Sequence, residues 1–419
     1  MNNFEINSDQ IGKIKKISPK EKIFRNKNLD FFKSVGFPNK NHEDWKFSDF
    51  NNIVNKNFKE LDAKILLESD DKIDLIKEFE HNYIFLINGN YQSSNFKFED
   101  EDNIIVKSNE NSINHSTTKN PLICLNHALA ENGYSLEVKK NYKFKKALVI
   151  YNFFTRDIKN KIINSKNKIK INENSELHTI EYTINQSKFN FINNVFENIF
   201  LEKNSKLKSL SLQKNISNGF FYKFIKSFSN LNSDYSNLIF SSGLKFNKVD
   251  IECDLLQENS KCNILSALFL NKSEHHEIKT RVNHLSQSCK SYQKVKNVLN
   301  ADSKGVYQGK IFVKEVAQKT DAYQLSKAIL LSERSEFDAK PELEIYADDV
   351  KCSHGSTSGN LDKDSIYYLM TRGLSQKEST KLLVNGFLNE IADSIKSNSI
   401  RNFIKNKLET QLLNEYKKH

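Results

Sequence analysis

The central part of the chain consists of short runs in which hydrophobic and polar residues alternate. From about Ala147 these runs read ALVIYNFF, KIKIN, LHTIEYTI, NIFLE, LKSLSLQ, VDIECDLL and CNILSALFL. Alternation with a period of two places every second side chain on one face of a strand, so each run predicts a β-strand. Helical patterns almost vanish in this region, which therefore predicts a core built mainly of strands.

A short turn phrase recurs between the strand-like runs. It reads INENSEL, LEKNSKL and LQENSKC around Ser175, Ser205 and Ser260, with looser copies NADSKGV at Ser303 and SERSEFD at Ser335. Asn and Asp tolerate the left-handed backbone conformation, so they replace glycine in turns of a chain that has 12 Gly and 4 Pro. The serine spacings of 30, 55, 43 and 32 residues are uneven and indicate β-helix coils with insertions; a β-sandwich is the alternative.

Helical patterns are expected at the two ends of the chain. The first part mixes short helices, at residues 62–79 and 121–133, with the strand-like run YIFLI. We therefore divide the chain into a mixed N-terminal region, residues 1–145, a β-helix core, residues 146–358, and a helical module, residues 359–419.

Cap signals and an apolar stripe define the C-terminal module. Asp362 can cap a first helix, and Ser375 with Glu378 forms the S-x-x-E capping box of the next. Leucine, phenylalanine and isoleucine then recur every four residues and give this helix one apolar face. The stripe consists of Leu383, Phe387, Ile391 and Ile395, widened by Leu382, Val384 and Leu388.

Composition narrows the class of protein. The net charge of +11 arises from 63 basic and 52 acidic residues that are interleaved, so it predicts a solvated surface and no nucleic-acid partner. Five scattered cysteines provide neither a disulfide framework nor a zinc knuckle. The polar start of the chain and the lack of apolar runs near about 20 residues predict no membrane association. We expect a cytoplasmic protein.

The candidate chemistry lies in the run ELEIYADDVKCSHGSTSG, residues 342–359. Cys352 and His354 stand two residues apart at the end of a strand-like pattern, so their side chains project from the same face. A thiolate sulfur and an imidazole nitrogen are ligands that iron, zinc and copper prefer. Two ligands complete neither a tetrahedral site nor an iron–sulfur cluster, so further ligands must come from elsewhere.

The sequence around this pair resembles the SufB/SufD family of iron–sulfur cluster assembly scaffolds. The resemblance rests on KPELEIYADDVKCSHGSTSGNLDKDSIYYLMTRGLSQKEST, residues 340–380, on VYQGKIFVKEVAQKTDAYQLSKAILLS, residues 306–332, and more weakly on GFPNKNHEDWKFSDF, residues 36–50. Gly355 after the histidine and the absence of any CxxC pair favour the SufD branch over SufB. Residues 51–115 match no part of the family pattern.

This resemblance implies both a fold and a function. The implied fold is mainly β, a right-handed parallel β-helix core with an N-terminal mixed and helical region and a C-terminal helical module. The implied function is that of a non-catalytic scaffold subunit in a SufBCD-type complex, with a SufB-like subunit and a SufC-like ATPase as partners. The nascent cluster would be transient and shared with the partner, this chain would bind no nucleotide, and it could form a homodimer without SufB.

The resemblance also assigns roles to residues. His354, and with it Cys352, would serve as cluster-assembly ligands at the interface with the SufB-like subunit. Leu382, Leu383, Phe387 and Ile391 would form the surface that docks the ATPase.

Other readings remain open from the residues alone. In one, the chain is a β-helix thiol enzyme with Cys352 as nucleophile and His354 as base; in another, it is a purely structural β-solenoid. His275, His276 and His284, with Cys289 nearby, are interpreted as turn or surface residues and not as a metal site. The segment GVYQGK lacks the spacing of a phosphate loop, and Trp45 is interpreted as a packing residue.

Overall fold

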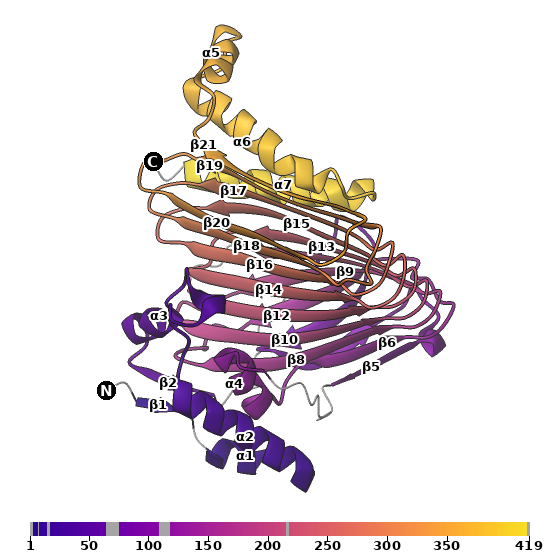
Figure 1. Ribbon diagram of the computed structural model, residues 1–419. Helices are drawn as coiled ribbons and strands as arrows, with labels where there is room; N and C mark the ends of the chain where they lie inside the picture. Colours follow the sequence, from indigo (N-terminus) through magenta and orange to yellow (C-terminus); the bar gives the residue numbers. More distant parts are fainter. Residues whose placement is uncertain are drawn as a thin grey trace.

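The computed structural model describes residues 3–6, 8–14, 17–63, 75–108, 118–214 and 218–416, and its centre is a β-solenoid of about eight turns (Figure 1). Each coil adds one strand to each of two sheets. The nine-stranded sheet contains β5 (Ile104–Ser108), β6 (Tyr134–Val138), β8 (Ile162–Ile171), β10 (Phe191–Leu201), β12 (Gly219–Ser229), β14 (Phe246–Leu255), β16 (His275–His284), β18 (Lys304–Val313) and β20 (Glu336–Ile345). The ten-stranded sheet contains β3 (Asn82–Ile87), β4 (Asn90–Asn95), β7 (Leu148–Phe154), β9 (Glu176–Asn185), β11 (Lys206–Lys214), β13 (Asp234–Ser241), β15 (Lys261–Leu270), β17 (Lys290–Leu299), β19 (Thr320–Leu330) and β21 (Val350–Gly359).

Successive coils pair in parallel and in register, so equivalent residues form columns along the axis. One inward column consists of Leu177, Leu207, Tyr235 and Cys262, all fully buried. The pairs β3–β4 and β5–β6 at the first end are antiparallel. The predicted parallel β-helix is therefore confirmed and the β-sandwich alternative is wrong.

The turns explain the uneven serine spacing. Ser175, Ser205, Ser233 and Ser260 occupy the same corner in consecutive coils, directly before strands of the ten-stranded sheet. The interval of 55 residues thus spans two ordinary coils, because Ser233 was not recognised as a copy. Ser303 and Ser335 lie at another corner, before β18 and β20. The serine spacing is uneven because it combines serines from two different corners, although the coils themselves are regular.

Asparagine supplies the left-handed turns, as the sequence predicts. Asn174, Asn204, Asn232 and Asn259 have φ between 55° and 59°. The Asn204 amide donates to Asn174 Oδ1 at 2.9 Å, and the Asn232 amide donates to Asn204 Oδ1 at 3.0 Å. The side chains that permit the turns therefore also link neighbouring coils.

The N-terminal region packs on the outer face of the nine-stranded sheet over β8 to β14 (Figure 1), and its residues 43–48 also reach β16 and β20. Of the helix predicted at 62–79, residues 64–74 lie outside the described part, and residues 75–79 are not helical. The helix predicted at 121–133 exists but ends at Leu129. Besides the strands that belong to the two large sheets, the N-terminal region contains β1 (Asn3–Glu5), α1 (Ser8–Lys13), α2 (Pro19–Val35), η1 (Glu43–Trp45), α3 (Phe50–Asn57), β2 (Glu60–Asp62), η2 (Glu101–Asn103) and α4 (Pro121–Leu129).

Gly133, the last residue of the predicted helix range, lies beyond the end of the helix and allows a close approach of the backbone to a strand. Its φ is 116°, and a Cβ atom there would lie 1.9 Å from the carbonyl oxygen of Lys166 on β8. Only glycine allows the chain to pass so close to the strand.

Trp45 anchors the N-terminal region, which confirms its predicted packing role. It is buried against Phe50, Tyr222 and Phe246, and the Lys248 ammonium lies 5.0 Å from the centre of one of its rings. Beneath it, Lys248 and Glu277 form a fully buried ion pair.

The Lys248–Glu277 pair is hydrogen-bonded to the N-terminal segment that carries Trp45. Ser48 Oγ donates to Glu277 Oε2 at 2.5 Å, and Gln308 Nε2 donates to Glu277 Oε1 at 2.5 Å. Lys248 also lies 3.1 Å from Asp250. A charged network thus joins the N-terminal segment to the sheet.

The C-terminal module comprises α5 (Lys363–Thr371), α6 (Gln376–Ala392) and α7 (Asn398–Tyr416). Asp362 caps α5 and the capping box of Ser375 and Glu378 opens α6, as predicted. α6 and α7 lie along the outer face of the ten-stranded sheet, whereas α5 projects beyond β21 (Figure 1). Among the described helices, none is both long and apolar enough to cross a bilayer.

We expect Lys248→Met to lower the free energy of unfolding by about 3–5 kcal/mol at pH 7, because it leaves Glu277 charged and buried. Burial raises the pKa of Glu277, but the Lys248 ammonium outweighs it and lowers that pKa overall. A carboxyl group whose pKa is lower in the folded than in the unfolded protein stabilises the fold at pH values above its unfolded pKa. This stabilisation is lost as the pH falls through its folded pKa. The difference in unfolding free energy between Lys248→Met and the parent should therefore become smaller towards pH 4.

Urea unfolding at pH 7 and pH 4 measures this difference. Lys310→Met is the matched control, since Lys310 pairs with Glu344 at the surface and its loss should cost less than about 1 kcal/mol. Equal deficits for Lys248→Met and Lys310→Met would contradict the prediction.

Candidate functional site

The candidate ligands lie at the last coil of the β-helix. β21 and β20 end their sheets, so each has one edge without a neighbouring strand among the described residues. In the register with β19, Cys352 pairs with Ala322 and His354 pairs with Gln324. Ala322 and Gln324 are buried and belong to inward columns. Cys352 and His354 therefore share one face, as predicted, and they continue the inward columns at a coil that no further coil covers among the described residues.

The two side chains differ in their surroundings. Cys352 is half-buried and packs on the apolar cluster of Ile311, Val313 and Ala322, whereas His354 is exposed. Burial raises the pKa of the Cys352 thiol, although a hydrogen bond with the Ala322 backbone opposes the shift. The thiol is therefore protonated at neutral pH and is not activated as a nucleophile.

The structure also shows which side chains interact with Cys352 and His354. Across the described residues, no hydrogen bond or ion pair connects His354 with Cys352, Asp348 or Asp349. No group of three or more His, Cys, Asp or Glu side chains is arranged to hold a metal ion in the described part of the chain. Within the described residues the pair alone therefore does not make up a metal site.

A fixed polar network lies directly beneath His354. Gln324 accepts a hydrogen bond from the Tyr307 hydroxyl at 3.1 Å and donates to the carbonyl oxygen of Glu342 at 3.1 Å. A Cβ atom at Gly309 would lie 2.1 Å from Gln324 Oε1, so a larger residue there would displace the Gln324 side chain from this network. Sequence reasoning missed this network; a glycine inside a strand of a glycine-poor chain was the available signal.

The histidines of β16 correct an expectation from the sequence. His276 and His284 are fully buried in this strand, and burial lowers the pKa of each to about 3. His276 is held by Ser241 Oγ at 2.8 Å and by the carbonyl oxygen of Leu244 at 2.9 Å. They are core residues, so their assignment to a turn or to the surface was wrong. The GVYQGK segment lies inside β18.

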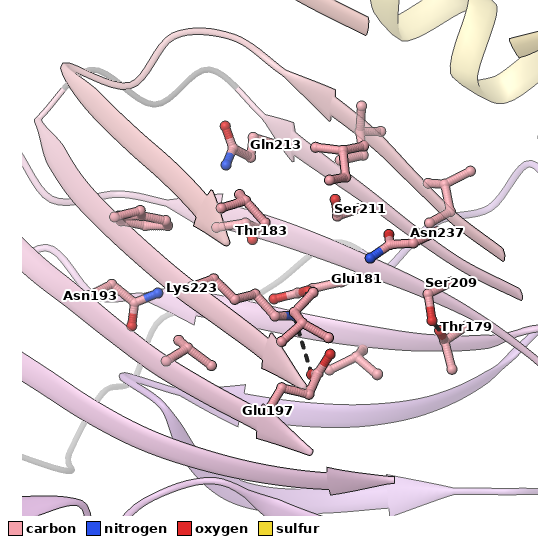
Figure 2. A pocket seen from close by; sticks show the side chains of 18 of the residues that line it. Thr179, Glu181, Thr183, Asn193, Glu197, Ser209, Ser211, Gln213, Lys223 and Asn237 are labelled. Carbon is pink, nitrogen blue, oxygen red and sulfur yellow. Dashed lines mark hydrogen bonds and ion pairs between the residues drawn. The ribbon is translucent and has the colours of Figure 1, made fainter. Parts of the chain in front are cut away.

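A second polar site, missed by sequence reasoning, lies inside the β-helix (Figure 2). Lys223 on β12 reaches Glu181 at 2.6 Å and Glu197 at 3.2 Å. Burial lowers the pKa of Lys223, but the two carboxylates outweigh this effect and raise it. Burial also raises the pKa of Glu197. The adjoining cavity of about 60 Å³ has room for about two water molecules.

The four residues expected to dock a partner differ in exposure. Leu382 is 52% exposed, Leu383 and Phe387 are half-buried, and Ile391 is buried against the sheet. The Lys296 ammonium lies 4.2 Å from the Phe387 ring centre. Most of the stripe therefore attaches α6 to the β-helix. Where burial is described, the large apolar side chains that the module exposes are Tyr367, Tyr368, Met370 and Leu382. Of these, the sequence indicated only Leu382.

Comparison with known proteins gives a consistent result. Residues 153–387 match the family model described as SUF system FeS cluster assembly, SufBD core domain. The chain is 23% identical to the iron–sulfur cluster assembly protein SufD of Escherichia coli over 379 residues, covering 88% of this chain and 87% of that protein. It is 28% identical to an iron–sulfur cluster assembly SufBD family protein of Synechocystis over 207 residues, covering 49% and 45% of the two chains.

We expect Cys352 to react with iodoacetamide at pH 7 more slowly than a free cysteine, because burial raises its pKa. The rate should still be rising at pH 9. Mass spectrometry of the native chain, with Cys352→Ser as control, identifies the modified residue. Fast alkylation that is already constant below pH 7 would instead support the thiol-enzyme reading.

Proposed function

This chain belongs to the SufB/SufD family of iron–sulfur cluster assembly proteins, and from that membership we propose that it is a non-catalytic scaffold subunit. The observation that carries the proposal is the position of His354 and Cys352 on the inward face of an uncovered terminal coil. In this proposal the nascent cluster is cargo, held briefly and shared with a partner subunit in the cytoplasm.

The partner that we propose at this end is a SufB-like subunit. An open strand edge exposes unpaired backbone N–H and C=O groups, which a partner can cover. Tyr346, which follows β20, is 60% exposed, and most residues of β21 are exposed although they lie in a strand. A subunit that covers this end would bring its own ligands to the imidazole of His354. A second copy of this chain is the alternative occupant when the SufB-like subunit is absent.

We further propose that a SufC-like ATPase binds the projecting part of the C-terminal module. α5 carries Tyr367, Tyr368 and Met370 on its exposed surface, and Leu382 on α6 extends the patch. Three residues, 360–362, separate β21 from α5. Movement of a docked ATPase would therefore act on the strand that holds His354, provided that the ATPase contacts differ between its nucleotide states.

The rest of the module supplies a fixed support. Glu390 on α6 pairs with both Lys294 and Lys296 on β17, and Lys296 also donates to the Phe387 carbonyl oxygen at 2.8 Å. α6 is thereby attached to the β-helix, while α5 remains available to a partner.

The double variant Tyr367→Ala with Leu382→Asp should weaken binding of the SufC-like ATPase by about 30-fold or more, because exposed aromatic and apolar anchors dominate interfaces. Its melting temperature should stay within about 2 °C of the parent, since both side chains are exposed. Calorimetric titration with the ATPase gives the affinity. Phe189→Asp, an exposed apolar residue far from the module, is the control; unchanged affinity in the double variant would exclude this patch.

His354→Ala should abolish most cluster formation on the assembled complex, because it removes an imidazole from an incomplete ligand set. The fold and subunit ratio should be unaffected, since the side chain is exposed. Iron content and cluster absorbance of the co-expressed complex are measured. Lys351→Ala, on the same strand and the opposite face, is the control. Normal iron loading in His354→Ala at an unchanged subunit ratio would remove His354 from the mechanism.

A further inference from the structure

A groove of about 430 Å³ lies between the outer face of the ten-stranded sheet and the link from α6 to α7. This volume is in the range of small-molecule sites. The groove is separate from the terminal coil and contains neither His354 nor Cys352. Its apolar lining includes Ile180, Leu210, Leu238 and Leu265 from four neighbouring strands of the sheet, and Ile395 and Ile400 from the link and α7.

The opposite end of the groove is polar. On β11 the outward residues Lys206, Lys208 and Leu210 follow one another, so the charges precede the aliphatic residue along the strand. The same order recurs on β9, where His178 precedes Ile180. Because neighbouring strands are in register, the polar residues gather at one end and the aliphatic residues at the other. The polar end is lined by His178, Lys206, Lys208, Asp234, Ser236, Asn263 and Lys396.

Positive charge prevails at the polar end. Lys206 and Lys396 form no ion pair with any residue of the described chain, and Lys208 only approaches Glu176 at 4.0 Å. Glu176 is engaged by His178 at 2.9 Å. Burial lowers the pKa of His178, and the nearby Lys208 and Lys396 ammonium groups lower it further, against the Glu176 hydrogen bond. Lysines from both walls of the groove thus meet near one imidazole.

We propose that this groove binds an amphipathic anion, with a carboxylate or phosphate head among Lys206, Lys208 and Lys396 and an unbranched hydrocarbon tail along the aliphatic end. The head would gain charge-assisted hydrogen bonds. The tail would bury apolar surface against both the sheet and Ile395. A free fatty acid and an acylated headgroup present this same chemistry. The site does not depend on the proposed scaffold role.

Occupation of the groove has a structural consequence. The bound molecule would touch the sheet on one side and the link between α6 and α7 on the other. Any ligand that binds only the folded form raises the melting temperature. The groove would therefore couple a small amphipathic anion to the attachment of the helical module.

The test uses decanoate below its micellar concentration, titrated into the full chain by calorimetry. We expect saturable binding at one site and a higher melting temperature. Lys208→Ala and Lys396→Ala should each weaken binding about tenfold, and Leu238→Asp should abolish it. Lys272→Ala, an exposed lysine outside the groove, should bind as the parent does.

Two further ligands separate the contributions of head and tail. Decylammonium, which has the same tail and the opposite charge, should not bind, and acetate should bind far more weakly than decanoate. Long-chain lysophosphatidate tests whether a phosphate head is accepted as well. No saturable decanoate binding, equal binding of decylammonium, or full affinity in Lys208→Ala and Lys396→Ala would each overturn the proposal.

Discussion

Each coil of the β-helix hydrogen-bonds to the next in register, so a column that points inward in one coil points inward in all of them. This parallel stacking fixes the direction of every side chain in the core. Ala322 and Gln324 are buried, and Cys352 and His354 continue their columns by one coil. Cys352 and His354 therefore face the axis because of the register.

The same stacking explains why the candidate site lies at an end. A column of inward residues is covered by the next coil everywhere except at the last one, where two strand edges also remain open. Among the described residues, the outer edge of β21 therefore has no neighbouring strand to pair with its backbone groups. Below them, Tyr307, Gln324 and Gly309 form a polar floor that leaves little freedom to the coil under His354.

Charges are buried inside the β-helix and also on the outer face of the nine-stranded sheet beneath Trp45, and both groups of charges constrain the register. Lys223 on β12 meets Glu197 on β10 and Glu181 on β9, and Lys248 on β14 meets Glu277 on β16. A slip of one residue would turn one partner of each pair to the other face of its sheet. The separated charge would stay buried and uncompensated, which costs several kcal/mol. We infer that these pairs favour one alignment of the coils.

The sequence by itself determined what depends on neighbours in the chain. Alternation predicted the strands, asparagine the left-handed turns, Asp362 and Ser375 the helix starts, and the two-residue spacing the shared face of Cys352 and His354. The tertiary structure decided what depends on which coil stacks on which. It revealed Ser233 as a missed repeat, buried His276 and His284, turned Ile391 towards the sheet, and brought Lys223 between two glutamates. These contacts join residues distant in sequence, and no local pattern encodes the register that brings them together.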